Sequence, residues 1–320
     1  MSISEPRLRE ASRLRAPALA ALIGCLALAA APSEAQPRPQ EPLGATIADT
    51  GSQTYRFRTI SLASADGRRR YRVQIAEPRR SPPPAGRQVI YLLDGNGAVA
   101  ALDEALLAKL DAAGDPPVLV AIGYDVDTRF DVQARAFDYT PPGAEGRPAA
   151  DPAGRPGGGA DAFLDLVERD IRPRVEAQAR IDRRRQTLWG HSYGGLLTVY
   201  AALSRPQAFQ HYVAASPSLW WNGGAVLDRE AGFADDPRRR NLRLDIVVGG
   251  AEGQGSGGPR PGGPMRNTLP PGSSEALARR LRDVGADVRF EEIPGESHGS
   301  MFAASLTRTL TFLAKTQHLP

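Results

Sequence analysis

The amino-acid sequence predicts an α/β fold with a mainly parallel central sheet, helices on both faces of it and an antiparallel hairpin before it. The runs QVIYLLD and PVLVAIGY are continuously apolar, as expected for strands covered on both faces. Such strands alternate with helical stretches over most of the 320 residues, which is the pattern of a parallel sheet. TYRFRTISL and RRYRVQIAE instead alternate apolar and polar residues around an ADG turn, which indicates a β-hairpin.

The remaining elements follow in chain order. After the first buried strand we expect a helix over 98–113, and after the second a long surface insertion over 125–160, which is rich in Gly and Pro without a clear period. Next come a Pro-kinked helix in DAFLDLVERDIRPRVEAQ, a strand in TLWG, a helix in YGGLLTVYAALS, and strands in FQHYVAAS and LRLDIVVGG. The chain then closes with a helix in SSEALARRLRDVG that has Ser at its cap and Gly at its end, a strand in ADVRFEEIP and a helix in SMFAASLTRTLTFLA. The sequence contains no evident internal repeat, and we expect residues 51–320 to form one domain.

The N-terminus predicts export. Residues 1–35 combine a basic start, an apolar run and small residues before a cleavage point, which is typical of a secretory signal peptide and too short for a lasting membrane span. Residues 36–50 are rich in Pro and Gln and are expected to form a flexible lead-in. LIGC is also similar to a bacterial lipobox, which would lipidate Cys25, but the apolar run continues past it. We therefore expect a periplasmic or secreted protein.

Composition excludes several function classes. The net charge of +4 is small, and the three Arg triplets are short, separate and close to turn signals, so we expect solvated loop ends and no nucleic-acid partner. Cys25 is the single cysteine. Once the signal peptide leaves, disulfides, thiolate catalysis and cysteine metal sites are excluded, and we expect neither a metal nor a cofactor.

A Gly-x-Ser-x-Gly pattern occurs twice, at 190–194 and at 295–299. In a nucleophile elbow the serine occupies a strained turn between a strand and a helix, and glycines are needed because larger side chains would collide with the neighbouring backbone. Both matches lie between a predicted strand and a predicted helix. The pattern alone therefore does not identify a nucleophile.

Chain order separates the two matches. An α/β-hydrolase fold presents its serine, acid and histidine in that order. Downstream of Ser192 lie Glu252, just beyond a strand, and then His298. Beyond the adjacent His298, only His318 and no acidic residue follow Ser297. We interpret Ser192 as the nucleophile, His298 as the base and Glu252 as the acid; the alternative for Glu252 is a solvated loop carboxylate beside a Ser–His dyad.

These residues predict acyl transfer. His298 would take the proton of Ser192, which would attack an ester carbonyl, and water would release the acyl-enzyme. The amide of Tyr193 and one amide from the loop LLDGNGAVA, which contains Gly95 and Asn96, are the expected oxyanion donors. Among the other histidines, we expect His191 to pack beneath the elbow and His211 to lie within a strand in a core or edge position.

With these residues in place, the chain resembles the bacterial siderophore esterases, which comprise periplasmic enterobactin and salmochelin hydrolases and cytoplasmic relatives within the esterase-D-like α/β-hydrolases. The resemblance spans roughly Tyr55 to Leu313. It rests on YLLDGN, IGYDVDTRFDVQARAFDYTPP, residues 190–203, SPSLWW and PGESHGSM, in that order. Relatives tend to carry VGE-x-E where this chain has VGGAE, so that Gly250 replaces one carboxylate while Glu252 remains.

The resemblance implies Ser192 and His298 as catalytic residues, Asn96 and Tyr193 around the oxyanion, and Arg135 near an anionic or catecholate part of the substrate. Arg135 would pair with a carboxylate or phenolate, or else form a structural ion pair with an acid such as Asp131 or Asp138. Trp220 and Trp221 either stack a catechol ring or serve as core or rim packing.

The function predicted from the sequence is that of a serine esterase acting on a catecholate siderophore, free or iron-bound, or on a similar lactone. Two enzyme alternatives keep the site and change the substrate: a general carboxylesterase, or an acyltransferase in which an alcohol outcompetes water. A third alternative is a binding module of the same fold whose catalytic residues are vestigial.

Overall fold

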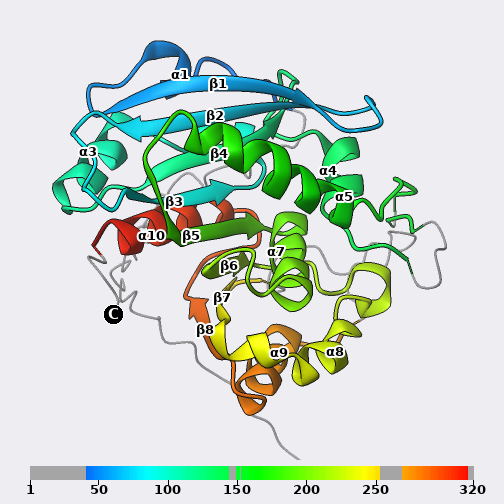
Figure 1. Cartoon of the computed structure of the whole chain (residues 1–320). Helices are drawn as coiled ribbons and strands as arrows, with labels where there is room; N and C mark the ends of the chain where they lie inside the picture. The colour runs from blue at the N-terminus through cyan, green and yellow to red at the C-terminus, as the bar shows by residue number, and fades with distance from the viewer. Residues whose placement is uncertain (1–40, 144–148, 152, 253–268, 316–320) are drawn as a thin grey trace, which may run out of the picture. The chain divides into compact units, whose positions relative to one another are not determined.

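A computed structural model describes residues 41–143, 149–151, 153–252 and 269–315. The predicted signal peptide, most of the glycine-rich segment after Glu252 and the middle of the predicted insertion lie outside the described residues. A sheet with strand order β1-β2-β4-β3-β5-β6-β7-β8 runs through the described part (Figure 1). Its strands are β1 Tyr55–Ala63, β2 Arg70–Pro78, β3 Arg87–Leu92, β4 Val118–Tyr124, β5 Ile181–His191, β6 His211–Ala215, β7 Arg243–Gly249 and β8 Asp287–Ile293.

The directions of the strands confirm the predicted sheet. β1 and β2 form an antiparallel hairpin, and β2 also pairs antiparallel with β4. From β4 to β8 every neighbouring pair is parallel. Parallel strands end at the same edge of a sheet, so the loops that follow β3, β5, β6, β7 and β8 are gathered there.

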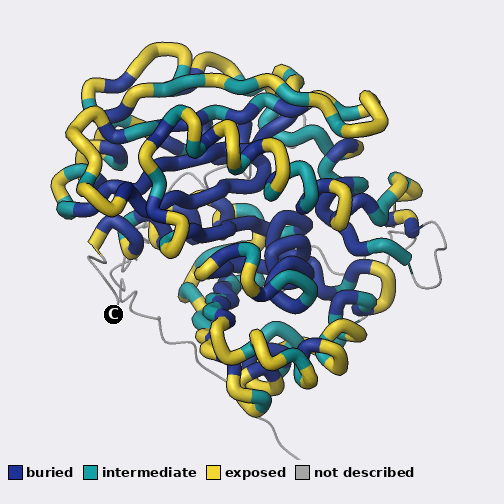
Figure 2. The backbone as a smooth tube through the Cα atoms, in the orientation of Figure 1, coloured by how far each residue is buried: buried dark blue, intermediate teal, exposed yellow. Residues whose placement is uncertain are grey.

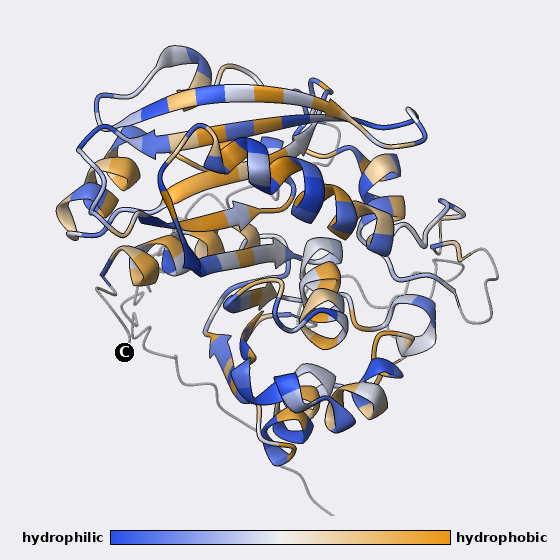
Figure 3. Ribbon diagram, viewed as in Figure 1, coloured by the Kyte–Doolittle hydropathy of each residue, from blue (hydrophilic) through white to orange (hydrophobic). Residues whose placement is uncertain are grey.

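The sheet is covered on both faces, as its continuous apolar strands predict. Successive residues of a strand point to opposite faces, and β3 divides accordingly: Val89 and Tyr91 belong to one apolar cluster, and Ile90 and Leu92 to the other. All four are buried. Figure 2 shows the middle of the sheet in the colour of buried residues, and the hydropathy colouring marks β3 and β4 as largely apolar (Figure 3).

The helices divide between the two clusters. On one side lie α2 Gly95–Ala100, α3 Glu104–Ala112 and α10 Met301–Lys315. On the other side lie α4 Val132–Asp138, α5 Ala160–Leu166, the π-helical turn η2 Val167–Ile171, α6 Arg172–Glu176, α7 Tyr193–Ser204, α8 Arg229–Asp235 and α9 Ser273–Asp283. Short elements α1 Ile47–Thr50, η3 Trp221–Gly224 and η4 Pro237–Asn241 complete the described secondary structure.

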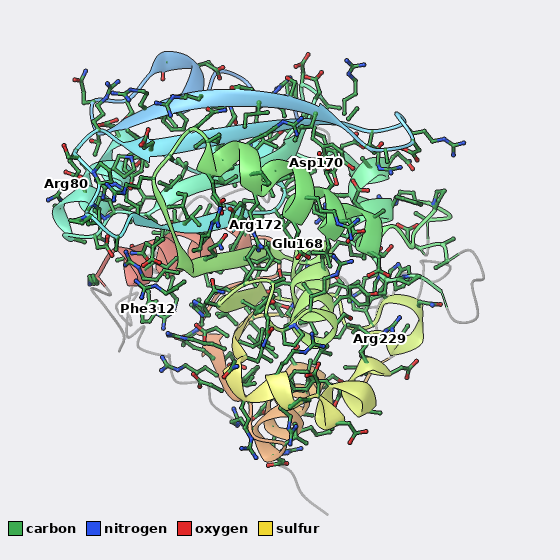
Figure 4. The ribbon with its side chains drawn as sticks, in the orientation of Figure 1. Arg80, Glu168, Asp170, Arg172, Arg229 and Phe312 are labelled. Atoms are coloured by element: carbon green, nitrogen blue, oxygen red, sulfur yellow. The ribbon has the colours of Figure 1, made fainter. Side chains whose placement is uncertain are left out.

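Cation–aromatic packing joins one helix to the sheet. The guanidinium carbon of Arg172, labelled in Figure 4, lies 4.4 Å from the ring centroid of Phe209, and that ring packs edge-on against Tyr91 of β3. A guanidinium over an aromatic face gains electrostatic attraction without leaving its aliphatic stem unpacked. Arg172 therefore anchors the start of α6.

Several element boundaries differ from those predicted from the sequence. The helix expected over 98–113 is two helices, because Asp103 caps a new one: its side chain accepts from the amide of Leu106 at 2.7 Å. The strand predicted as TLWG is the end of the longer β5. At α9 the cap is Gly272 in a left-handed conformation, and Ser273 is the first helical residue.

Two segments predicted to lack structure carry some. Within the lead-in, Thr46 and Asp49 form a capping box around the one-turn α1, and Pro42 forms a bridge to Thr128. Within the insertion over 125–160, α4 forms and several residues are buried, among them Asp138, Tyr139 and Asp151. The described part of the insertion is therefore partly a packed layer, and the prediction of a surface loop is wrong for these buried residues.

Candidate active site

Ser192 stands on a strained turn between β5 and α7. Its backbone has φ 59° and ψ −114°, a region that residues other than glycine rarely occupy. Gly190 has no room for a side chain, since a Cβ there would lie 2.4 Å from the backbone of Gly194. The turn therefore has the form of a nucleophile elbow, and the glycine pattern has a steric reason.

The structure brings Ser192, His298 and Glu252 together. The Oγ of Ser192 lies 3.1 Å from Nε2 of His298, and Nδ1 of His298 lies 3.4 Å from Oε2 of Glu252. The first distance suits a hydrogen bond, whereas the second is long for one. About half of the His298 side chain is exposed and a quarter of that of Glu252, so both groups remain open to solvent while they face each other.

The second Gly-x-Ser-x-Gly match supplies the histidine and no second elbow. Gly295 has φ +77° with open space around its missing Cβ, and the hydroxyl of Ser297 lies 3.1 Å from that of Ser300. This segment is the turn between β8 and α10. Its role in the site is to carry His298 to the carboxyl edge of the sheet.

Glu252 is held by three donors. Its Oε1 accepts from the amide of Gly249 at 2.8 Å and from the hydroxyl of Ser216, while Oε2 faces His298. Burial alone would raise the pKa of Glu252, but the hydrogen bonds from His298, Ser216 and Gly249 outweigh burial and lower it. The carboxylate is therefore ionised at neutral pH, as a group that orients a histidine must be.

His191 packs beneath the elbow. Its ring is buried, its Nε2 lies 2.8 Å from the carbonyl oxygen of His298, and the two imidazole centroids are 4.9 Å apart. Burial, and then the neighbouring His298, lower the pKa of His191 well below 6.5. A neutral His191 that carries its proton on Nε2 donates a hydrogen bond to the His298 carbonyl and so holds the backbone of His298 in place.

A buried neutral histidine makes stability depend on pH. Below pH 6.5 the unfolded chain binds a proton at His191 that the folded protein does not, so stability is present above this pH and is lost as pH falls. We expect His191 to contribute up to about 1.4 kcal/mol of lost stability per pH unit. Chemical unfolding of His191→Gln between pH 7 and 5 should give a flatter dependence than the wild type; equal slopes would contradict this account.

The predicted oxyanion donors lie at two helix starts beside Ser192. α7 begins at Tyr193 and α2 at Gly95, so the amides of Tyr193, Gly95 and Asn96 belong to first turns, which lack acceptors within their own helices. A Cβ on Gly194 would lie 3.3 Å from the side chain of Leu93 and 3.6 Å from that of Asp94, so the residues that precede α2 lie beside the start of α7. Their positive dipole ends suit a developing oxyanion.

The side chain of Asn96 has a different use. Its Nδ2 donates to the carbonyls of Tyr124, Val126 and Thr128 at 3.0–3.1 Å, and the residue is buried. These contacts hold the loop after β4 against α2. An oxyanion role for Asn96 is therefore restricted to its backbone amide.

Arg135 forms an ion pair, but not with the predicted partners. Its Nε and Nη2 lie 2.7 and 2.8 Å from the two carboxylate oxygens of Asp94, in a bidentate arrangement. Burial disfavours the charge, and the pairing with Asp94 outweighs it, so the pKa of Arg135 is raised. Asp131 caps α4 instead, and Asp138 pairs with Arg69. Of the two interpretations of Arg135, the structural ion pair therefore applies, and its partner is Asp94.

The two adjacent tryptophans lie in different environments. Trp221 is wholly buried in the core, so it cannot stack a substrate ring, and that interpretation is wrong for this residue. Trp220 is partly exposed and packs against Tyr193, with ring centroids 6.0 Å apart. Tyr193 in turn lies beneath the guanidinium of Arg135 at 5.3 Å, so Trp220 remains next to the elbow.

Two further residues of the site escaped prediction from the sequence. Ser218 lies 3.2 Å from Ser192, measured between hydroxyl oxygens, and Ser216 binds Glu252. Both belong to the Ser-Pro-Ser turn that follows β6. The available signal was its position, because a polar turn after a central parallel strand ends at the same edge as the elbow.

Two features are absent from the described residues: a metal-binding cluster and a membrane-spanning helix. Within the described ranges, no cluster of three or more His, Cys, Asp or Glu side chains has the arrangement of a metal site. None of the helices in the same ranges is both long and apolar enough to cross a membrane.

The fold and the site together define an α/β-hydrolase with a serine-hydrolase arrangement of Ser192, His298 and Glu252. The family model described as "Putative esterase" matches residues 64–313. The chain belongs to this esterase family.

The chain is similar to several esterases. It is 37% identical over 294 residues to the apo-salmochelin esterase of Escherichia coli O6:H1, covering 90% of this chain and 88% of that one. It is 34% identical over 258 residues to the ferri-bacillibactin esterase BesA of Bacillus subtilis, covering 78% and 87%. Among solved structures, the enterobactin and salmochelin hydrolase IroE matches with a TM-score of 0.69 and 35% identity over 84% of this chain and 99% of that one; IroE has also been solved in complex with DFP.

Proposed function

We propose that this protein hydrolyses ester bonds of a catecholate siderophore, or of a similar lactone, through an acyl-enzyme at Ser192. The observation that carries the proposal is the continuous contact from Ser192 through His298 to Glu252 on an elbow with strained backbone. The named relatives are siderophore esterases, which supports the substrate class.

In the proposed reaction, Glu252 accepts the Nδ1 proton of His298 in a hydrogen bond, which leaves Nε2 free to accept. His298 takes the proton of Ser192 as the Oγ attacks the ester carbonyl, and the amides of Tyr193 and Gly95 hold the oxyanion. His298 then returns the proton to the leaving alkoxide. A water molecule, deprotonated by His298, attacks the acyl-enzyme and releases the acid, which restores Ser192.

Arg135 has a positioning role in this proposal. Because both carboxylate oxygens of Asp94 are engaged by Arg135 and Asp94 directly precedes α2, the ion pair fixes the loop that supplies the second oxyanion amide.

Trp220, beside Tyr193, is the proposed contact for an aromatic ring of the substrate. The proposed site of action is the periplasm or the exterior, on the basis of the signal-like residues 1–35.

The substrate class is tested by comparing specificity constants. Enterobactin, with and without iron, and p-nitrophenyl esters of short acids are incubated with the purified protein, and linear products are quantified by chromatography. We expect kcat/KM for a siderophore form to exceed that for the simple esters by about 100-fold or more, because contacts with the acyl group are used in the transition state. A preference for the simple esters would overturn the siderophore assignment and leave a general carboxylesterase.

A further inference from the structure

The turn Ser216-Pro217-Ser218 touches both ends of the proposed triad. Ser216 hydrogen-bonds the acid Glu252, and Ser218 lies 3.2 Å from Ser192 between hydroxyl oxygens. Both serines are buried, with 3% and 2% of their surface exposed. Their hydroxyls are therefore directed at catalytic groups and not at bulk water.

The backbone of this turn is fixed to the elbow and to the sheet. The amide of Ser192 donates to the carbonyl of Ala215 at 3.0 Å, and the amide of Ser218 donates back to the carbonyl of Ser192 at 3.1 Å. On the other side, the amide of Ser216 donates to Val247 at 2.7 Å. A Cβ on Gly195 would lie 2.7 Å from the Ala215 carbonyl, so α7 packs directly against the turn. The backbone that carries the two serine hydroxyls is therefore held rigidly in place.

Ser216 binds one oxygen of the Glu252 carboxylate and leaves the other oxygen to His298. It occupies Oε1 together with the Gly249 amide, which leaves Oε2 directed at His298. Ser216 itself has φ +43°, a left-handed conformation that costs energy in a residue other than glycine. The strain is explained if the conformation aims its hydroxyl at the acid.

Ser218 gives the nucleophile a second hydrogen-bond partner. When His298 is neutral and accepts at Nε2, the Ser192 hydroxyl donates to His298 and Ser218 donates to Ser192. When His298 carries a proton on both nitrogens, Nε2 donates to Ser192, whose own hydroxyl then donates to Ser218. A hydroxyl serves as donor or acceptor by rotation, so Ser218 holds the Ser192 side chain in both states.

We propose that Ser216 and Ser218 are positioning residues for the hydrolysis reaction, the first for Glu252 and the second for Ser192; this inference rests on the proposed function of the same site. Ser216 keeps the acid ionised and directed at His298. Ser218 keeps the nucleophile in the rotamer that meets Nε2.

The experiment compares Ser216→Ala and Ser218→Ala with Ser305→Ala, a matched control. Ser305 lies in α10, is as deeply buried as the two serines, and its hydroxyl has no partner among the described residues. Two rates are measured against pH: kcat/KM for an activated aryl ester, and the second-order rate of inactivation by DFP, in which the Ser192 oxygen displaces fluoride from phosphorus and its proton passes to His298. The DFP rate reports the nucleophile without any siderophore, so a wrong substrate assignment and a wrong inference give different results.

We expect Ser216→Ala to lower both rates by about 10- to 100-fold, which is the size of a lost hydrogen bond to a charged group. The acidic limb of the pH–rate profile should also move to higher pH, because Glu252 loses one of the hydrogen bonds that lower its pKa. Ser216→Gly, which also lacks the hydroxyl but suits a positive φ, should lose as much activity as Ser216→Ala, so that backbone strain does not account for the loss. In a Glu252→Gln background, Ser216→Ala should change the rate less than about twofold, since residues that act through one another are not additive.

Ser218→Ala should lower both rates by about fivefold, the size of one neutral hydrogen bond, with the acidic limb unmoved. Ser305→Ala should leave both rates at the wild-type value. Equal DFP rates for wild type and Ser218→Ala would overturn the role of Ser218. An additive loss from Ser216→Ala in the Glu252→Gln background would overturn that of Ser216, because it would mean that the residue acts through the fold and not through the acid.

Discussion

Replacing Ser192 with alanine is expected to abolish ester hydrolysis, with kcat falling by about 10⁵-fold or more. Removal of the nucleophile in a serine hydrolase eliminates the covalent route and leaves only what the oxyanion amides and substrate binding provide. The substitution removes one hydroxyl, which lies within hydrogen-bond distance of His298 and Ser218. The measurement is turnover of an activated aryl ester with active-site concentration determined independently.

Folding is the necessary control for this variant. The strained backbone at φ 59° is available to alanine as much as to serine, and the backbone bond from the Ser192 amide to Ala215 is retained. We therefore expect an unfolding midpoint within a few degrees of the wild type. Retained turnover in a folded Ser192→Ala protein would eliminate Ser192 as the nucleophile.

Replacing Glu252 with glutamine should lower kcat/KM by about 10²- to 10⁴-fold. A glutamine has nearly the same shape, but its amide can present a donor to Nδ1, which favours the histidine tautomer whose Nε2 already carries a proton and cannot accept the one from Ser192. The carboxylate also stabilises the imidazolium that forms during attack. The lower part of this range is consistent with the long 3.4 Å contact and the exposure of His298.

This variant decides between a triad and a dyad. With a dyad, Glu252 would be a bystander and its replacement would cost less than about tenfold. Glu252→Asp provides the complementary control, because it keeps the charge and shortens the side chain, so it should lose activity by distance alone. Wild-type rates in Glu252→Gln would require the acid assignment to be withdrawn.

Much of the sheet is predictable from the sequence because its strands obey local rules. A strand buried on both faces must be apolar throughout, which marks β3 and β4, whereas the outer hairpin alternates because one side of it meets solvent. Chain order then places a residue after each parallel strand at one edge. For this reason Ser192, Glu252 and His298 could be nominated from the sequence, although they lie up to 106 positions apart.

Other features depend on contacts that no local pattern encodes. Arg135 is three and four residues from two carboxylates, Asp138 and Asp131. It nevertheless pairs with Asp94, 41 positions away, because the fold brings α4 close to the residue that precedes α2. Trp220 and Trp221 are neighbours in sequence, but the short helical turn that begins there sends one ring into the core and leaves the other near Tyr193. The roles of Ser216 and Ser218 likewise arise from the meeting of three loops.

The central claim, cleavage of a siderophore ester through Ser192, is tested most directly by trapping the intermediate. Wild-type protein mixed with excess enterobactin is quenched in acid within the first turnovers and digested, and its peptides are mapped by mass spectrometry. We predict an adduct of the acyl portion of the substrate on the peptide that contains Ser192, formed in the wild type and missing in Ser192→Ala. Turnover of enterobactin by Ser192→Ala, or an adduct confined to another residue, would contradict the account.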